Sequence, residues 1–130
     1  MNEITKFDPE TLLALAESFK NGVPLPHIKE IFLIETHVAG TSYLNLDEIE
    51  KTLQNGEFIK LIREPQNTYD SLAILIFDSK GNKLGYVPRD KNEVIARLMD
   101  AGKFIFGKLI TREYVNNWLM ITVQIYMRDM

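Results

Sequence analysis

The segment Arg63-Glu64-Pro65-Gln66-Asn67-Thr68-Tyr69-Asp70 joins two apolar runs, residues 58–62 and 72–77, and it governs how the rest of the sequence is interpreted. Both runs have the apolar composition and the length of strands. An ordinary hairpin connection has about two to five residues, mostly Gly, Asn or Asp. Because this connection is longer and carries an arginine, an amide, a tyrosine and a carboxylate, it predicts a loop that presents binding groups from a rigid sheet.

Outward from this loop, the pattern predicts a mainly β protein with α insertions. Strands are expected over residues 31–38, 58–62, 72–77, 83–87, 103–112 and 118–127. Short helices are expected over residues 46–54 and 91–100, the second with Asp90 and Glu93 at capping-box spacing and with Val94, Ile95, Leu98 and Met99 facing inward. Most connections are too short for the crossover helices of a parallel sheet, so we expect a six-stranded curved sheet or small barrel.

The amino-terminal residues follow a different pattern. Asp8 can cap a helix over residues 8–20 whose apolar positions approximate one face: Leu12, Leu13, Leu15, Ala16 and Phe19. Pro24-Leu25-Pro26 then breaks any helix and is typical of an extended linker. Two regions are therefore predicted, namely an N-terminal helix with a Pro-rich linker over residues 1–27 and a β-barrel domain over residues 28–130.

Size and composition favour an ordinary globular protein. The chain has 130 residues, of which 45% are hydrophobic and 25% charged, and it contains no cysteine, which excludes disulfides and thiolate metal sites. It shows neither a secretory signal nor an apolar run of about 18 residues, so we expect a cytoplasmic protein with no membrane partner. Residues 1–57 carry ten acids against four bases, and residues 58–130 carry eight acids against eleven bases. This asymmetry either reflects ordinary solvated charges or lets the weakly basic second part face phosphate, and then only over a small area.

A search for catalytic motifs is negative. The two histidines, His27 and His37, lack the spacing of a zinc site, and no nucleophile elbow, phosphate-binding loop or dinucleotide fingerprint is present. We therefore expect no enzyme activity, no cofactor and no metal.

Binding residues are easier to identify. Tyr43 in Gly40-Thr41-Ser42-Tyr43 either stacks on a flat ligand or lies half buried beside a turn, and Tyr86 is either a second stacking ring or an ordinary sheet aromatic. In the 63–70 segment, Arg63 can pair with phosphate, Asn67 can hydrogen-bond to the edge of a ligand or to a hydroxyl, and Tyr69 can stack on a flat ligand. Asp70 either accepts a hydrogen bond from a sugar hydroxyl or caps its own loop. Arg89, next to a helix start, can help to hold an anion.

These segments, together with Gly81-Asn82-Lys83-Leu84-Gly85-Tyr86-Val87-Pro88-Arg89, resemble the HIRAN domain in order and spacing over roughly residues 31–128. The resemblance implies an OB-like β-barrel, and a free-standing prokaryotic form is expected because no helicase or RING segment accompanies it. It also implies binding of single-stranded DNA at a free 3′ end, in DNA repair or replication-fork processing, with a repair or helicase protein as a further partner.

The resemblance also implies roles for single residues. Tyr43, Tyr69 and Tyr86 would stack on or flank bases, Asn67 and Asp70 would lie near the terminal sugar, and Trp118 would add a further ring. Ser42 departs from the pattern, because DNA-binding members carry an arginine there. A guanidinium contact to phosphate is worth about 1–3 kcal/mol, so compensation by Arg63 or Arg89, weaker binding and a changed ligand remain alternatives.

A second hypothesis is a protein-interaction or adaptor module with little or no DNA binding. In that case the acidic N-terminal helix would dock a partner and the barrel would be structural.

Overall fold

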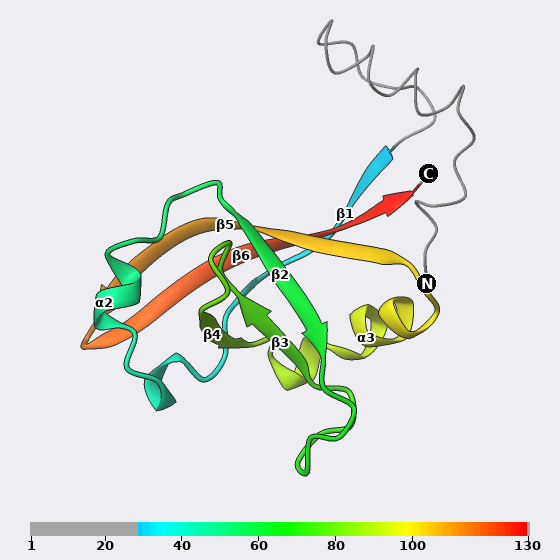
Figure 1. Cartoon of the computed structure of the whole chain (residues 1–130), viewed down its shortest axis with the longest axis horizontal. Helices are drawn as coiled ribbons and strands as arrows, with labels where there is room; N and C mark the ends of the chain where they lie inside the picture. Colours follow the sequence, from blue (N-terminus) through cyan, green and yellow to red (C-terminus); the bar gives the residue numbers. More distant parts are fainter. Residues whose placement is uncertain (1–28, 130) are drawn as a thin grey trace, which may run out of the picture.

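The computed structural model describes residues 29–129, in which six antiparallel strands form one curled sheet with the order β1-β6-β5-β2-β3-β4 (Figure 1). The strands are β1 (Lys29–His37), β2 (Phe58–Arg63), β3 (Ile74–Phe77), β4 (Lys83–Tyr86), β5 (Phe104–Val115) and β6 (Trp118–Asp129). The helical segments are η2 (Thr41–Tyr43), α2 (Asp47–Glu50), η3 (Arg89–Lys91) and α3 (Glu93–Asp100). All six predicted strands are confirmed. The predicted helix over residues 8–20 and the linker lie outside the described residues.

The β5–β6 hairpin is the longest feature of the molecule, and β1 lies along β6 (Figure 1). Its turn consists of Asn116 and Asn117, with φ angles of 50° and 67°. Positive φ at both central residues matches the right-handed twist of a hairpin, and asparagine tolerates this conformation better than most residues. Because the turn is this tight, pairing runs to Val115↔Trp118, and β5 extends three residues beyond its predicted end.

One pair of hydrogen bonds joins the two ends of the curled sheet. The N–H of Ala39, just after β1, donates to the carbonyl oxygen of Tyr86 in β4 at 2.8 Å, and the N–H of Tyr86 donates to the Ala39 carbonyl at 2.9 Å. Gly85 permits this approach, because a Cβ there would collide with the Ala39 carbonyl oxygen and the Val38 side chain. The closure brings the turn after β1 beside β4.

The inside of the curl is apolar, as the alternation of the strands requires. Its fully buried side chains come from every part of the sheet and from α3: Val38, Ile59, Ile74, Ile76, Leu84, Ile95, Leu109, Ile121, Val123 and Ile125. Each such side chain stabilises the fold by roughly 1.5–3 kcal/mol relative to an exposed one. The core therefore supplies the rigid frame from which the loops project.

The helical insertions differ from the prediction. The first, α2, is a single turn over Asp47–Glu50 instead of residues 46–54. The second, α3, begins after the 3₁₀ turn η3, so its N-cap is Asn92 and the capping box predicted for Asp90 and Glu93 is wrong. Val94 was predicted to face inward but is 67% exposed, because Ile95 and Ala96 occupy the face that packs on the sheet. Within residues 29–129, no helix is long and apolar enough to cross a membrane.

Candidate functional site

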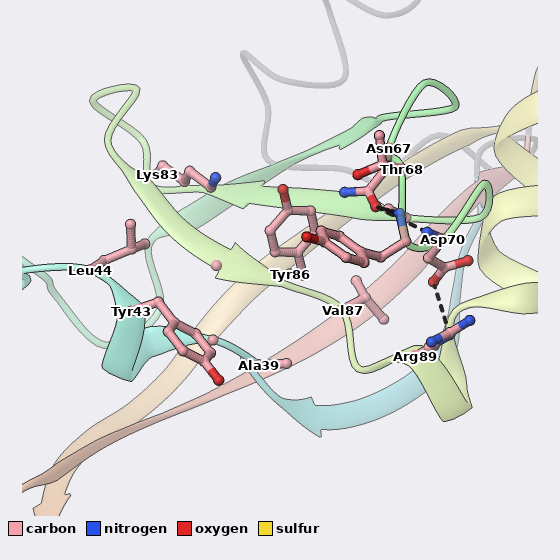
Figure 2. A pocket seen from close by; sticks show the side chains of 14 residues that line it. Ala39, Tyr43, Leu44, Asn67, Thr68, Asp70, Lys83, Tyr86, Val87 and Arg89 are labelled. Carbon is pink, nitrogen blue, oxygen red and sulfur yellow. Dashed lines mark hydrogen bonds and ion pairs between the residues drawn. The ribbon is translucent and has the colours of Figure 1, made fainter.

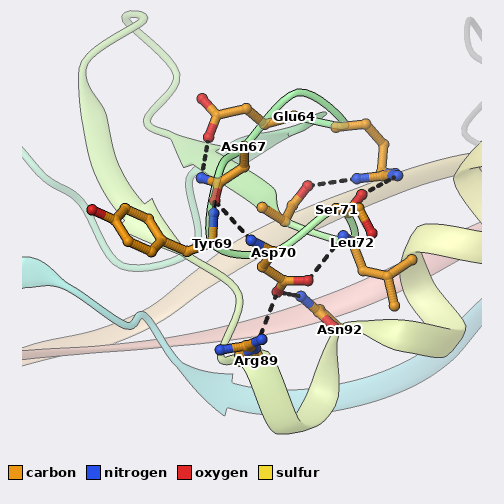
Figure 3. A network of polar contacts seen from close by, with 10 residues as sticks. Glu64, Asn67, Tyr69, Asp70, Ser71, Leu72, Arg89 and Asn92 are labelled. Atoms are coloured by element: carbon orange, nitrogen blue, oxygen red, sulfur yellow. Dashed lines mark hydrogen bonds and ion pairs between the residues drawn. The ribbon is translucent and has the colours of Figure 1, made fainter.

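The loop between β2 and β3 is held by its own polar side chains (Figure 3). The Oδ1 atom of Asn67 accepts hydrogen bonds from the backbone N–H groups of Tyr69 (2.8 Å) and Asp70 (3.0 Å). Its Nδ2 donates to Glu64 at 2.6 Å. With both ends of its amide engaged, Asn67 fixes the loop in a single shape and directs Tyr69 outward.

Asp70 occupies the centre of the same network. Its Oδ1 accepts from the backbone N–H of Leu72 at 2.9 Å, and its Oδ2 accepts from Nδ2 of the buried Asn92 at 2.8 Å. The Leu72 bond first, and the Asn92 bond second, hold the pKa of Asp70 below its usual value. Arg89 lies 4.0 Å away with its side chain 77% exposed. Asp70 is therefore an ionised cap of its loop, and a carboxylate has enough lone pairs to accept one further hydrogen bond.

Arg63 connects this loop to α3. Its guanidinium donates to both carboxylate oxygens of Asp100, at 2.9 and 3.2 Å, and to the carbonyl oxygens of Ser71 and Ala73, at 2.9 and 2.7 Å. The side chain is only 14% exposed, and the same pair holds the pKa of Asp100 low. Four of its five N–H donors are thus engaged inside the protein, where they are not available to a phosphate.

Three tyrosines come together beside this loop. Tyr43 and Tyr69 are 90% and 85% exposed, which is unusual for rings of this size. The Tyr86 hydroxyl donates to Glu64 at 2.9 Å, and the Lys83 ammonium lies 4.9 Å from its ring centre. The Asn67 and Tyr86 hydrogen bonds lower the pKa of Glu64. Tyr86 is therefore fixed in orientation, whereas Tyr43 and Tyr69 project freely.

The turn that carries Tyr43 is anchored to β6 by a buried hydrogen bond. Gly40 adopts a left-handed conformation with φ of 84°, and the buried Thr41 hydroxyl donates to the Leu119 carbonyl oxygen at 2.8 Å. With Thr41 pointing into the protein, Ser42 and Tyr43 point away from it. The prediction that this turn presents an aromatic ring agrees with the exposure of Tyr43.

These groups surround an open cavity of about 760 Å³ (Figure 2). Six of the nine predicted site residues line it: Tyr43, Asn67, Tyr69, Asp70, Tyr86 and Arg89. Three do not, because Ser42 and Arg63 lie outside the lining and Trp118 packs edge-on against His37 near the hairpin turn, with 6.3 Å between ring centres.

Two side chains of the candidate site were missed from the sequence. Lys83 lines the cavity, and strand alternation could not have identified it, because a register shift between Lys83 and Gly85 in β4 brings its ammonium beside the Tyr86 ring. Glu64 orients both Asn67 and Tyr86, and no sequence signal indicates that role. Among residues 29–129, no three His, Asp or Glu side chains gather in a way that could hold a metal ion.

Comparisons with known proteins agree with this fold. The family model of the HIRAN domain matches residues 31–128. The crystal structure of a protein from Lactobacillus plantarum has a TM-score of 0.72 at 26% identity, over 79% of this chain and 99% of that one. The HIRAN domain of human HLTF gives a TM-score of 0.62 at 23% identity, over 77% and 79% of the two chains. Its NMR structure in a DNA-bound conformation gives 0.55 at 23% identity, over 78% and 80%. The predicted OB-like fold is thereby confirmed.

Curated relatives match over shorter stretches. The helicase-like transcription factor of Oryctolagus cuniculus is 34% identical over 64 residues, which is 49% of this chain and 6% of the relative. The Fanconi-associated nuclease 1 homolog of Arabidopsis thaliana is 31% identical over 78 residues, which is 60% of this chain and 8% of the relative. The chain therefore spans less than a tenth of the length of either relative.

Proposed function

The chain belongs to the HIRAN domain family, and on that premise we propose that it is a non-enzymatic module that binds single-stranded DNA at a free 3′ end. The observation that carries the proposal is the cavity in which two exposed tyrosines and one fixed tyrosine surround an ionised aspartate. The role of such a module is DNA repair or replication-fork processing.

Stacking supplies most of the affinity. Tyr43 projects from η2 and Tyr69 from the loop between β2 and β3, and both line the cavity. Neither ring is buried in the core. Stacking of a base on an aromatic ring contributes roughly 1–3 kcal/mol, so two or three rings account for binding in the micromolar range. Tyr86 presents a ring whose orientation is already fixed by Glu64, which reduces the entropy lost on binding.

Charge at the cavity favours a hydroxyl end over a phosphate end. Asp70 remains ionised at neutral pH and can accept a hydrogen bond from a terminal 3′-hydroxyl, whereas it repels a terminal phosphate. Lys83 and Arg89 line the same cavity and can contact internucleotide phosphates nearby. Asn67 holds the loop that carries Asp70, so its contribution is to position the site.

Few phosphates are neutralised in this arrangement. Arg63 is engaged with Asp100 and two carbonyl oxygens, so it does not replace the family arginine absent at Ser42. Lys83 and Arg89 remain as the cations of the cavity, and we expect the logarithm of affinity to fall with the logarithm of salt concentration with a slope of about −1 to −3.

Fluorescence anisotropy of short labelled DNA tests the proposal. The probes are a single strand ending in a 3′-hydroxyl, the same strand ending in a 3′-phosphate, and a blunt duplex. We expect the hydroxyl end to bind most tightly, and the double variant Tyr43→Ala/Tyr69→Ala to lose at least about tenfold in affinity. Tyr114→Ala is the matched control, because Tyr114 is half exposed and lies outside the cavity.

Two results would contradict the proposal. Equal affinity for the hydroxyl and phosphate ends would remove Asp70 from end recognition, even if single strands bind. Absence of binding to all three probes at tens of micromolar protein would leave the adaptor hypothesis, in which the family fold is kept and DNA binding is lost.

A further inference from the structure

A row of aromatic rings crosses the outer surface of the sheet, away from the cavity. We call it the aromatic face, and it consists of Phe32, Phe58, Phe104, Phe106 and Tyr126. Ring centres are 5.7 Å apart for Phe32 and Tyr126, 5.5 Å for Tyr126 and Phe106, and 6.0 Å for Phe106 and Phe58. The row therefore runs without a gap over β1, β6, β5 and β2, which are neighbours in the sheet (Figure 1).

This composition is unusual for the outside of a small barrel. An antiparallel sheet with one face on the core normally carries polar residues on its other face. Here Phe32, Phe58 and Phe104 are 52%, 56% and 42% exposed, although the two rings between them are more deeply buried. Phe106 is buried, so the exposed part of the row consists of Phe32, Phe58 and Phe104, and exposed apolar rings that gather on one face of a sheet indicate a docking site. None of the five residues lines the cavity, so the aromatic face is a separate surface.

The rings are poorly arranged for stacking bases. Phe106 and Tyr126 already stack on each other at an interplanar angle of 16°. The Lys108 ammonium lies 5.3 Å from the Tyr126 ring centre, and the Arg128 guanidinium lies 5.1 and 5.0 Å from the ring centres of Phe104 and Phe106. Because Phe106 and Tyr126 are already stacked on each other, Phe32, Phe58 and Phe104 are the rings of this face that offer exposed surface to an incoming group, and an apolar protein segment can pack against all three.

We propose that residues 8–20 of this same chain dock on the aromatic face as an amphipathic helix. Their apolar positions approximate one face in the sequence, and that face needs a partner to be stable in water. A helix of 13 residues is about 20 Å long, and four adjacent strands span about 14 Å between the outer two. The predicted helix therefore matches the row in length.

The connection allows this docking. Residues 21–28 lead directly into β1, and Phe32 lies on that strand. Nine peptide units from residue 20 to Lys29 reach up to about 30 Å, which is enough to fold back over the whole face. A short tether also raises the effective concentration to the millimolar range, so weak apolar contacts are sufficient.

Charge supports the same occupant. Residues 1–28 carry four acids, Glu3, Asp8, Glu10 and Glu17, against the two bases Lys6 and Lys20. The aromatic face carries Lys108 and Arg128 on its rings. The Arg128 guanidinium is already paired with Glu30 at 2.9 Å, so Lys108 supplies most of the positive charge that an acidic segment meets there, which favours correct docking over alternative positions.

A spin label on the full chain tests this proposal. Because the sequence has no cysteine, Ala14→Cys provides a single attachment point on the side of the predicted helix opposite its apolar residues. We expect the oxidised label to broaden the amide NMR signals of Phe32, Phe106 and Tyr126 several-fold relative to the reduced label. The signal of Asn116, at the hairpin turn, should be unchanged.

Variants separate docking from simple proximity. Adding Leu12→Asp and Phe19→Asp to the labelled chain should abolish the broadening, whereas Ser18→Asp, which adds charge outside the apolar positions, should preserve it. Phe58→Ser with Phe104→Ser on the face should also abolish it. Broadening confined to residues next to Lys29, or unchanged by these variants, would overturn the proposal.

Two other occupants give distinct results. If broadening appears when labelled chain is mixed with an unlabelled, isotopically enriched chain, the occupant is a second copy and the intramolecular proposal is wrong. If a single-stranded oligonucleotide shifts the signals of the aromatic face while the label does not broaden them, the face is a nucleic-acid surface and the proposal fails.

Discussion

Two hairpin loops flank β3, and each is organised around one aspartate that accepts hydrogen bonds through both carboxylate oxygens. In the loop between β3 and β4, Asp78 is fully buried, and its partners are Lys80 and Asn82, both within four residues. In the loop between β2 and β3, Asp70 is bonded to Leu72 nearby and to Asn92, 22 residues away, and it borders the cavity. The same local chemistry thus closes one turn and, in the other, places an ionised group at the edge of the cavity.

The largest expected effect is the loss of the buried aspartate. Asp78→Ala removes the acceptor for three hydrogen bonds in a site without solvent, so we expect the free energy of unfolding in urea to fall by about 2–4 kcal/mol. DNA affinity of the folded protein should not change. The exposed Asp90→Ala is the control, with an expected change within about 0.5 kcal/mol. Equal effects at the two positions would contradict the structural role of Asp78.

The two asparagine partners sharpen the comparison. Asn92→Ala leaves one oxygen of Asp70 without its donor, and we expect a loss of about 1–2 kcal/mol in stability together with a few-fold loss in DNA affinity. Asn82→Ala removes the corresponding donor from Asp78, so it should reduce stability alone. Urea unfolding and anisotropy on both variants check this. If Asn82→Ala lost as much DNA affinity as Asn92→Ala, the affinity loss would come from general destabilisation of the domain and not from the Asn92–Asp70 hydrogen bond.

Replacing each aspartate by asparagine isolates the charge. Asp70→Asn keeps the size of the side chain and removes the repulsion of a terminal phosphate, so the preference for a 3′-hydroxyl over a 3′-phosphate should fall by up to about tenfold. Asp78→Asn should leave the preference unchanged, since Asp78 does not line the cavity. The ratio of the two dissociation constants is the measurement, and an unchanged ratio in Asp70→Asn would rule out end discrimination by this carboxylate.

The smallest expected effect is a pH dependence. The folded pKa of Asp70 lies below its ordinary value of 3.8, chiefly because of the Leu72 hydrogen bond. The stabilisation is therefore fully present above the ordinary pKa and is lost as pH falls through the lowered one. The difference in unfolding free energy between the wild type and Asp70→Asn should be constant above about pH 5 and narrow below pH 4. A difference that widens on acidification would contradict the assignment.

Much of the fold could be predicted from the sequence because strand signals are local. Alternation and turn residues identified all six strands. Helix starts were less predictable, because Asn92 stands at the N-cap and sends its side chain to Asp70 instead of capping its own helix. The position of this helix start therefore depends on Asp70, which lies 22 residues earlier in the chain.

The members of the candidate site could be predicted where they lie in the recognisable motifs. They could not be predicted where a partner far away in the sequence determines the position of a side chain. Tyr43, Tyr69 and Tyr86 line one cavity, in line with the motifs that contain them. Arg63 belongs to the same segment as Asn67, but its side chain is paired with Asp100, which is 37 residues away. This pairing gives Arg63 a structural role that the sequence did not indicate. Trp118 was grouped with the stacking rings by resemblance, but the hairpin geometry pairs it with His37.

The single hydrogen-bonded pair between Ala39 and Tyr86 has a consequence for motion. β1 and β4, the strands on its two sides, are the outermost in sheet order, and they are joined here by one residue pair. We therefore expect this junction, the seam, to open before the longer strand pairings do. Tyr43 lies on one side of the seam and Tyr86 on the other. A nucleotide that contacts both rings would therefore hold the seam shut, and the amide exchange rates of Ala39 and Tyr86 would report its occupancy.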